Sequence, residues 1–330
     1  MSDPDSNHDK DVPNAPPTPP NPLLSDIAPD GDIVFIVGEE KARLRVYSQC
    51  LRAASPVLNT MFGPKWSEGQ RLSTQKPLEI RLKEDDADAL RTILCMLHHR
   101  TSDVPEILTA AQVLNIAVAS DKYDLARALK YVRTHWLKTT KGENLSAMTD
   151  LLAAARLFGD EDMFAAQSLE LIIRVKGSFL ELRHSSIIKL LFPDIIGLLE
   201  HRRNVMKADL CRIIEDGKNL LTCCRGGREQ EILKDRKDRF ISLYGRYSMT
   251  AVFDTSVEAI IDDIEAIPEP VIIPGAFRVS CAYYSFPSTI HEPARLEDSF
   301  AFKLEALKKR VAICMDCARG APECTEFKHV

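Results

Sequence analysis

A short strand pair opens the ordered part of the predicted fold. Residues 33–37, with the sequence IVFIV, form a continuous apolar and β-rich run, which is typical of a buried strand. After a connection at 38–41, residues 42–46 alternate apolar side chains with Arg43 and Arg45, the period expected of a strand with one buried face. The pattern therefore predicts a β-hairpin, which needs further elements to cover its apolar side.

Helices and one more strand follow the hairpin. The alternating and helical patterns predict a third strand over 77–82 and helices over 48–55, 56–62, 84–99, 105–123 and 124–137. Ser55 suits the N-cap of the second helix and Pro56 its first turn, while Asp85 or Asp86 can cap the third. This order of elements predicts a small α+β domain over residues 30–138.

The rest of the chain, residues 142–330, is predicted to be a mainly helical domain. One helix starts at the cap residue Asn144 and stops at Gly159. Further helical patterns cover 160–175, 194–222, 228–247, 255–266 and 294–318, while 271–290 looks irregular or weakly extended. No internal repeat of fixed period is visible, which disfavours a solenoid or propeller.

The first 29 residues have the composition of a disordered tail. They hold eight prolines, five acidic residues and one lysine, and such a segment buries too little apolar surface to offset the entropy cost of ordering. We predict a disordered Pro-rich tail over 1–29, followed by the α+β domain.

Composition limits the possible partners and the compartment. The net charge of -5 argues against a broad surface for nucleic acid or anionic membrane, and no window is apolar enough for a transmembrane helix. Nine scattered cysteines indicate an intracellular protein with reduced thiols, in the cytoplasm, the nucleus or both.

Five motifs in order resemble the BTB/POZ domain. They are DIVF from Asp32, Leu51 with ASPVLNTMF, Glu68-Gly69, IRLKEDDADAL and ASDKYDLARAL. The closest likeness is to fungal BTB proteins with a helical C-terminal extension. The resemblance implies a protein-interaction module, commonly a homodimer, that recruits other proteins. Some family members resemble substrate adaptors of cullin-type ubiquitin ligases, and others are transcriptional co-regulators.

The chain departs from the family at three places. Tyr47 stands where members often carry His, Ser48 stands where a basic residue often follows, and His98-His99 replace a Tyr at the end of the helix after the third strand. In repressor-type members the first pair builds a charged pocket with the strand Asp, which matches Asp32 here. That style of corepressor recruitment is therefore in doubt.

Trp66-Ser67-Glu68 matches the form and place of a cullin-binding element of the family, a hydrophobic residue two positions before Glu. An aromatic side chain there would anchor an interface. The alternative is that Trp66 packs on its own domain. The predicted protein interface comprises Asp32, Leu51, Trp66 and Glu68, and its partners are a second copy of the chain and other proteins, with a cullin as the candidate.

No motif for catalysis or cofactor binding is present, so we predict no enzyme, no cofactor and no catalytic residue. Cys314-x-x-Cys317, followed by Cys324 and His329, is the only spacing that suggests zinc. Its second pair is irregular, and packed or free thiols are the competing interpretation. The alternative function, a nuclear transcriptional co-regulator, would require a DNA-bound partner, because no DNA-reading motif is found and no direct nucleic-acid contact is expected.

Overall fold

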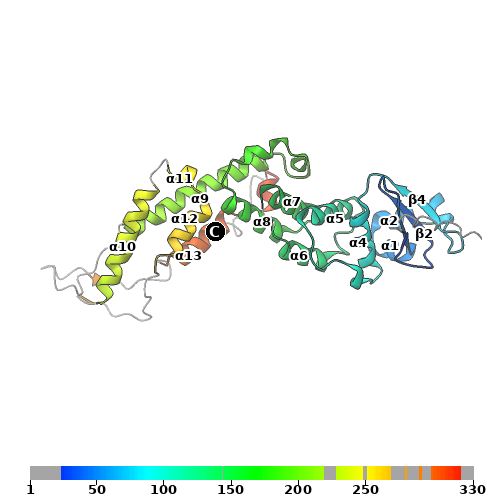
Figure 1. The fold of residues 1–330 in the computed structure, drawn as a ribbon, viewed down its shortest axis with the longest axis horizontal. Helices are drawn as coiled ribbons and strands as arrows, with labels where there is room; N and C mark the ends of the chain where they lie inside the picture. The colour runs from blue at the N-terminus through cyan, green and yellow to red at the C-terminus, as the bar shows by residue number, and fades with distance from the viewer. Residues whose placement is uncertain are drawn as a thin grey trace, which may run out of the picture. The chain divides into compact units, whose positions relative to one another are not determined.

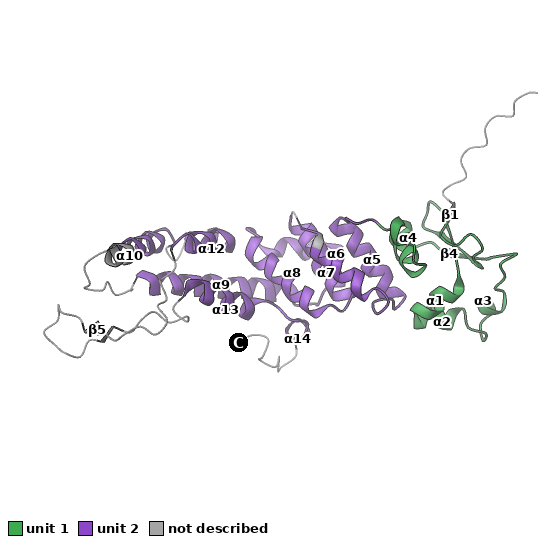
Figure 2. Ribbon diagram, turned by 90° about the horizontal axis from the view of Figure 1, so that it is seen from below, with its two compact units in different colours: residues 1–104 green, residues 105–330 purple. Residues whose placement is uncertain are grey.

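The computed structural model describes residues 24–142, 144–218, 228–247, 251–268, 279–280, 290–291 and 299–320. By its internal contacts the chain divides into two compact units, residues 1–104 and 105–330 (Figure 2). The prediction of an α+β segment followed by a mainly helical one is confirmed.

A four-stranded sheet forms the centre of the first unit (Figure 1). Its strands are β1 (Leu24–Asp26), β2 (Ile33–Val37), β3 (Ala42–Val46) and β4 (Leu78–Leu82), in the order β1-β3-β2-β4. The predicted hairpin of β2 and β3 is antiparallel, whereas β1 runs parallel to β3 and β4 runs parallel to β2. Gly38 allows the hairpin turn, because its φ of +68° is costly for other residues.

The prediction of a disordered tail over residues 1–29 is wrong for its last residues, because the chain forms strand β1 there. Ile27 and Ala28, just after β1, are buried. The Ala28 N–H donates to the Arg45 carbonyl at 2.9 Å, and the Arg100 guanidinium donates to the carbonyls of Asp26 and Ile27 at 3.2 Å. Order therefore begins by Leu24, earlier than composition suggested, while residues 1–23 of the predicted tail lie outside the described residues.

Two helices of the first unit, α2 (Pro56–Met61) and α4 (Ala87–Leu97), start at the predicted caps. The unit also contains α1 (Ser48–Ala54), α3 (Ser67–Gln70) and the 3₁₀ turn η1 (Thr101–Asp103). Ser55 Oγ accepts from Leu58 N at 2.9 Å and Asp86 Oδ1 accepts from Ala89 N at 2.8 Å, so each satisfies a helix-terminal N–H group. The short helix α3 was not predicted.

The second unit is built almost entirely of helices. These are α5 (Ala110–Lys122), α6 (Lys130–Thr139), α7 (Leu145–Leu157), α8 (Glu161–Arg174), η2 (Phe179–His184), η3 (Ser186–Leu190), α9 (Ile195–Lys218), α10 (Arg228–Arg246), α11 (Ala251–Asp254), α12 (Val257–Glu265), α13 (Phe300–Val311) and α14 (Met315–Ala318). Helix α7 is central, since every residue from Met148 to Ala155 is buried, and it packs against α5 and α8. Helix α9 packs against α8, α10, α12 and α13.

Several predicted helices are shorter in the structure. The helix expected over 105–123 starts at Ala110, where Thr109 and Gln112 form a capping box, and the helix expected over 84–99 is Ala87–Leu97. The helix expected over 124–137 starts at Lys130, because Asp124 has a φ of +50° and the chain turns before α6. The helix expected over 294–318 starts at Phe300 and stops at Val311, after which Ile313 N donates to Ser168 Oγ at 2.9 Å instead of continuing the helical ladder.

The described residues do not fully test two other predictions, the domain boundary and the irregular segment 271–290. The predicted domain boundary between 138 and 142 differs from the division between the compact units after residue 104, so the boundary stays a prediction. Most of the segment 271–290 lies outside the described residues, apart from part of the antiparallel pair β5 (Val279–Ser280) and β6 (Ile290–His291).

Candidate functional site

Asp32 holds the start of helix α1. It lies directly before β2, and its two carboxylate oxygens accept hydrogen bonds from Ser48 N at 2.7 Å and Ser48 Oγ at 2.6 Å. The residue before the helix, Tyr47, makes no side-chain cap, so Asp32 takes over the role that an N-cap side chain usually has. The carboxylate predicted to serve an interface is thus engaged by Ser48.

Leu51 lies in the core of the first unit with 0% exposure. It was predicted as an interface residue together with Asp32, but its side chain forms no part of the surface of the single chain. Leu51 supports α1 from inside, and any effect on an interface would come through the position of that helix.

Trp66 is exposed, in contrast to the alternative that it packs on its own domain. Its side chain is 55% exposed at the N-terminus of α3. The backbone is fixed, because Trp66 N donates to Gly63 O and Trp66 O accepts from Gln70 N, both at 3.2 Å. A large apolar side chain is therefore presented on an anchored short helix.

Glu68 lies half-buried in the same helix. Its Oε2 accepts a hydrogen bond from Ser67 Oγ at 2.9 Å. The predicted Trp66-Ser67-Glu68 element thus forms one turn of helix, with its aromatic residue as the N-cap and its acid inside the turn.

The large apolar side chains that are exposed in the described first unit come from one stretch of the chain. They are Tyr47, Val57 and Trp66, all between the end of β3 and the start of α3. Val57 was missed by sequence reasoning, although its place beside the buried Leu58 in α2 is a usable signal.

Cys50, in α1, has no feature of a nucleophile. Burial raises the pKa of its thiol above the ordinary value, and the Asp32 carboxylate raises it further. Cys50 therefore stays protonated at neutral pH, whereas a reactive thiol needs a lowered pKa.

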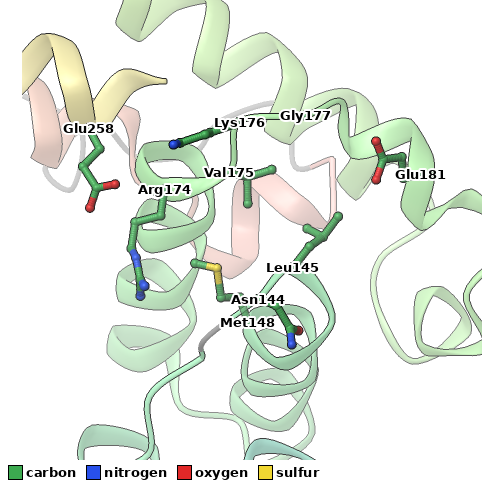
Figure 3. Close-up of a pocket in the computed structure, with 9 residues that line it drawn as sticks. All are labelled: Asn144, Leu145, Met148, Arg174, Val175, Lys176, Gly177, Glu181 and Glu258. Atoms are coloured by element: carbon green, nitrogen blue, oxygen red, sulfur yellow. The ribbon is translucent and has the colours of Figure 1, made fainter. Parts of the chain in front are cut away.

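A pocket of about 270 Å³ lies in the second unit, at the start of α7 and the end of α8 (Figure 3). Leu145, Met148 and Val175 supply its apolar part. The charged lining residues are of both signs, namely Arg174, Lys176, Glu181 and Glu258. The lining residues include no Ser, Cys or His.

Cys314 and Cys317 are placed by the last described helix. Cys314 is buried and is the N-cap of α14, and its Sγ accepts from Cys317 N at 3.4 Å. Arg202 contacts Cys317 Sγ at 3.6 Å. Cys324 and His329 lie outside the described residues, and within the described ranges no group of three or more His, Cys, Asp or Glu side chains is arranged to hold a metal ion.

None of the helices in the described part of the chain combines the length and apolar character needed to cross a membrane. The comparisons with known proteins add one family. Residues 30–135 match the family model of the BTB/POZ domain, which covers strands β2 to β4, the helices from α1 to α5 and the first part of α6. No curated protein matches the chain.

Proposed function

Residues 30–135 are a BTB/POZ domain, and from this premise we propose that the chain acts inside the cell by binding, not by catalysis. The domain is a protein-interaction module. In our proposal it joins two copies of the chain into a homodimer and recruits a further protein. The mainly helical second unit would then supply additional binding surface.

The narrower form of the proposal is a substrate adaptor of a cullin-type ubiquitin ligase. The exposure of Trp66 carries it, because exposed aromatic side chains on a rigid backbone are typical anchors of interfaces. Glu68, in the same turn, would contribute charge complementarity at the rim.

Co-purification with a cullin from cell extract tests the adaptor function. We expect the full wild-type chain to retain a cullin. Trp66→Ala should lower the amount of retained cullin at least about tenfold, as for a typical hot-spot residue. Glu68→Lys should also lower the amount of retained cullin. Phe302→Ala is the matched control, since Phe302 is another exposed aromatic side chain but lies in α13 of the second unit. Absence of cullin with the wild-type chain would refute the adaptor function and leave the binding module standing.

The co-regulator alternative has less support from the described residues. The charged pocket of repressor-type members needs the strand carboxylate, and here Ser48 occupies both oxygens of Asp32. Imaging of the tagged chain tests this alternative and the proposed location together, because a protein excluded from nuclei cannot act on chromatin.

A further inference from the structure

The outer edge of β4 has the properties of a self-complementary interface. Strand β4 is the last strand of the four-stranded sheet, next to β2 (Figure 1). We propose that two copies of the chain pair antiparallel along β4, with a two-fold axis at Ile80, so that the two sheets join into one. This inference rests on the homodimer proposed above and locates its interface.

The backbone of β4 has hydrogen-bonding groups directed away from the sheet. Leu78 N donates to Asp32 O and Gly38 N donates to Leu82 O, both at 2.9 Å. Because a parallel ladder uses alternate residues, Leu78, Ile80 and Leu82 bond toward β2. The N–H and C=O groups of Glu79 and Arg81 then face the open edge, where they are available to another strand.

A two-fold axis at Ile80 uses these groups in pairs. It places Glu79 opposite Arg81 of the second copy, and Arg81 opposite Glu79 of that copy. Each such pair exchanges two N–H···O bonds in an antiparallel ladder, while Ile80 faces its own copy in a pair without hydrogen bonds. The arrangement therefore satisfies all the outward groups of Glu79 and Arg81.

The side chains agree with the same register on both faces of the sheet. Glu79 and Arg81 are exposed on the outer face, and opposite charges meet across the axis. On the core face Leu78 is buried, whereas Ile80 and Leu82 are only half-buried at the edge. Antiparallel pairing sets Leu78 against Leu82 of the second copy and Ile80 against Ile80, which covers the remaining apolar surface.

The charge order distinguishes this edge from one protected against pairing. Edges that resist association often carry charges of one sign, which repel when two copies meet. Here an acid, Glu79, and a base, Arg81, flank Ile80, so a two-fold axis at Ile80 brings opposite charges together. The Arg43 guanidinium already contacts Glu79 Oε1 at 2.7 Å on the outer face, which holds the Glu79 side chain in place within the chain.

Two single charge reversals in the full chain test the register. Arg81→Glu sets the native Glu79 against a second acid across the axis, and Glu79→Arg sets the native Arg81 against a second base, so each variant carries two like-charge pairs. We expect each to raise the dimer dissociation constant roughly tenfold, measured by sedimentation equilibrium. Circular dichroism checks the fold, with Arg81→Glu as the cleaner variant because it keeps the bond between Arg43 and Glu79.

A mixture of the two variants provides the decisive control. The Arg81→Glu chain carries acids at both positions and the Glu79→Arg chain carries bases at both, so one copy of each restores both opposite-charge pairs. We expect fluorescently labelled Arg81→Glu to bind unlabelled Glu79→Arg as tightly as wild type binds itself. Failure of the mixture to associate would overturn the antiparallel register.

Hydrogen exchange gives a second readout that does not depend on any variant. The amides of Glu79 and Arg81 should gain protection as the concentration of wild-type chain rises, whereas the Ile80 amide, already bonded to β2, should not change. Unchanged dimerisation of both variants would place the dimer on another surface and leave the proposed homodimer intact. A wild-type chain that stays monomeric at all micromolar concentrations would refute both.

Discussion

His98, at the end of α4, lies against Tyr47, the residue before α1. Their ring centroids are 6.1 Å apart with an angle of 24° between the planes. Tyr47 N donates to His98 Nε2 at 3.0 Å, and His98 Nδ1 donates to Leu94 O at 2.8 Å. These are two of the positions at which the chain departs from the BTB/POZ pattern that it resembles, in which His often stands at the position of Tyr47 and Tyr at the position of His98-His99. The structure shows that the two departures form one contact.

This contact predicts a pH dependence of stability. Burial lowers the pKa of His98 below its usual 6.5, and the nearby His99 lowers it further. A protonated ring would also lose the bond from Tyr47, because Nε2 could no longer accept. The fold therefore favours neutral His98: its contribution is fully present above about pH 6.5, the ordinary value, and is lost as the pH falls through the lowered value.

His98→Gln removes this titration. We expect the free energy of unfolding in urea to vary less between pH 7 and pH 5, about the range in which histidine titrates, than in wild type. His99→Asn is the control for loss of a neighbouring histidine, since Asn tolerates the φ of +57° at that position. Equal pH profiles for His98→Gln and wild type would contradict the prediction.

Three local capping signals were identified correctly from the sequence, although the capping box of Thr109 and Gln112 was missed, and long-range contacts were not predicted. Ser55, Asp86 and Asn144 act as predicted caps because a cap bonds to a backbone group three residues away. The bonds from Ser48 to Asp32 span 16 residues, and the contact from Tyr47 to His98 spans 51. No periodic pattern reports such pairs, so the engagement of Asp32 became visible only in the folded chain.

Strand β1 and helix α3 were missed for a related reason. A strand of three residues and a helix of four are too short for a periodic pattern. Strand β1 also depends on its pairing with β3, which the bond from Ala28 N to Arg45 O extends. The exposure of Trp66 was also open, because the sequence allows an aromatic residue after a short helix to lie inside or outside.

The bonds between Asp32 and Ser48 predict an energetic coupling. Asp32→Ala leaves the first turn of α1 without its carboxylate and should lower the free energy of unfolding by about 2–3 kcal/mol, as for charged hydrogen bonds. Ser48→Ala removes one of the two donors and should cost about 1–2 kcal/mol. A double-mutant cycle in urea should give a coupling of about 1 kcal/mol. Strictly additive effects would show that the two residues act independently.

Gly69 fixes the helix that presents Trp66. A Cβ atom at this position would lie 2.1 Å from Gly63 O and 2.6 Å from Phe62 O, both backbone atoms that cannot rotate away. Gly69→Ala must therefore displace α3, and we expect a loss of about 1–3 kcal/mol in the free energy of unfolding, as for an overpacked site.

The same substitution tests whether partner capture depends on the position of Trp66 as well as on its aromatic side chain. Gly69→Ala keeps the aromatic side chain but moves its helix, so partner capture should fall in the direction of Trp66→Ala. Gly197→Ala is the matched control, because a Cβ there meets no atom within 4 Å in α9 and alanine favours a helix by up to about 1 kcal/mol. If Gly69→Ala altered neither the free energy of unfolding nor partner capture, α3 would tolerate displacement. The presentation of Trp66 would then not depend on the close approach of Gly69 to Phe62 and Gly63.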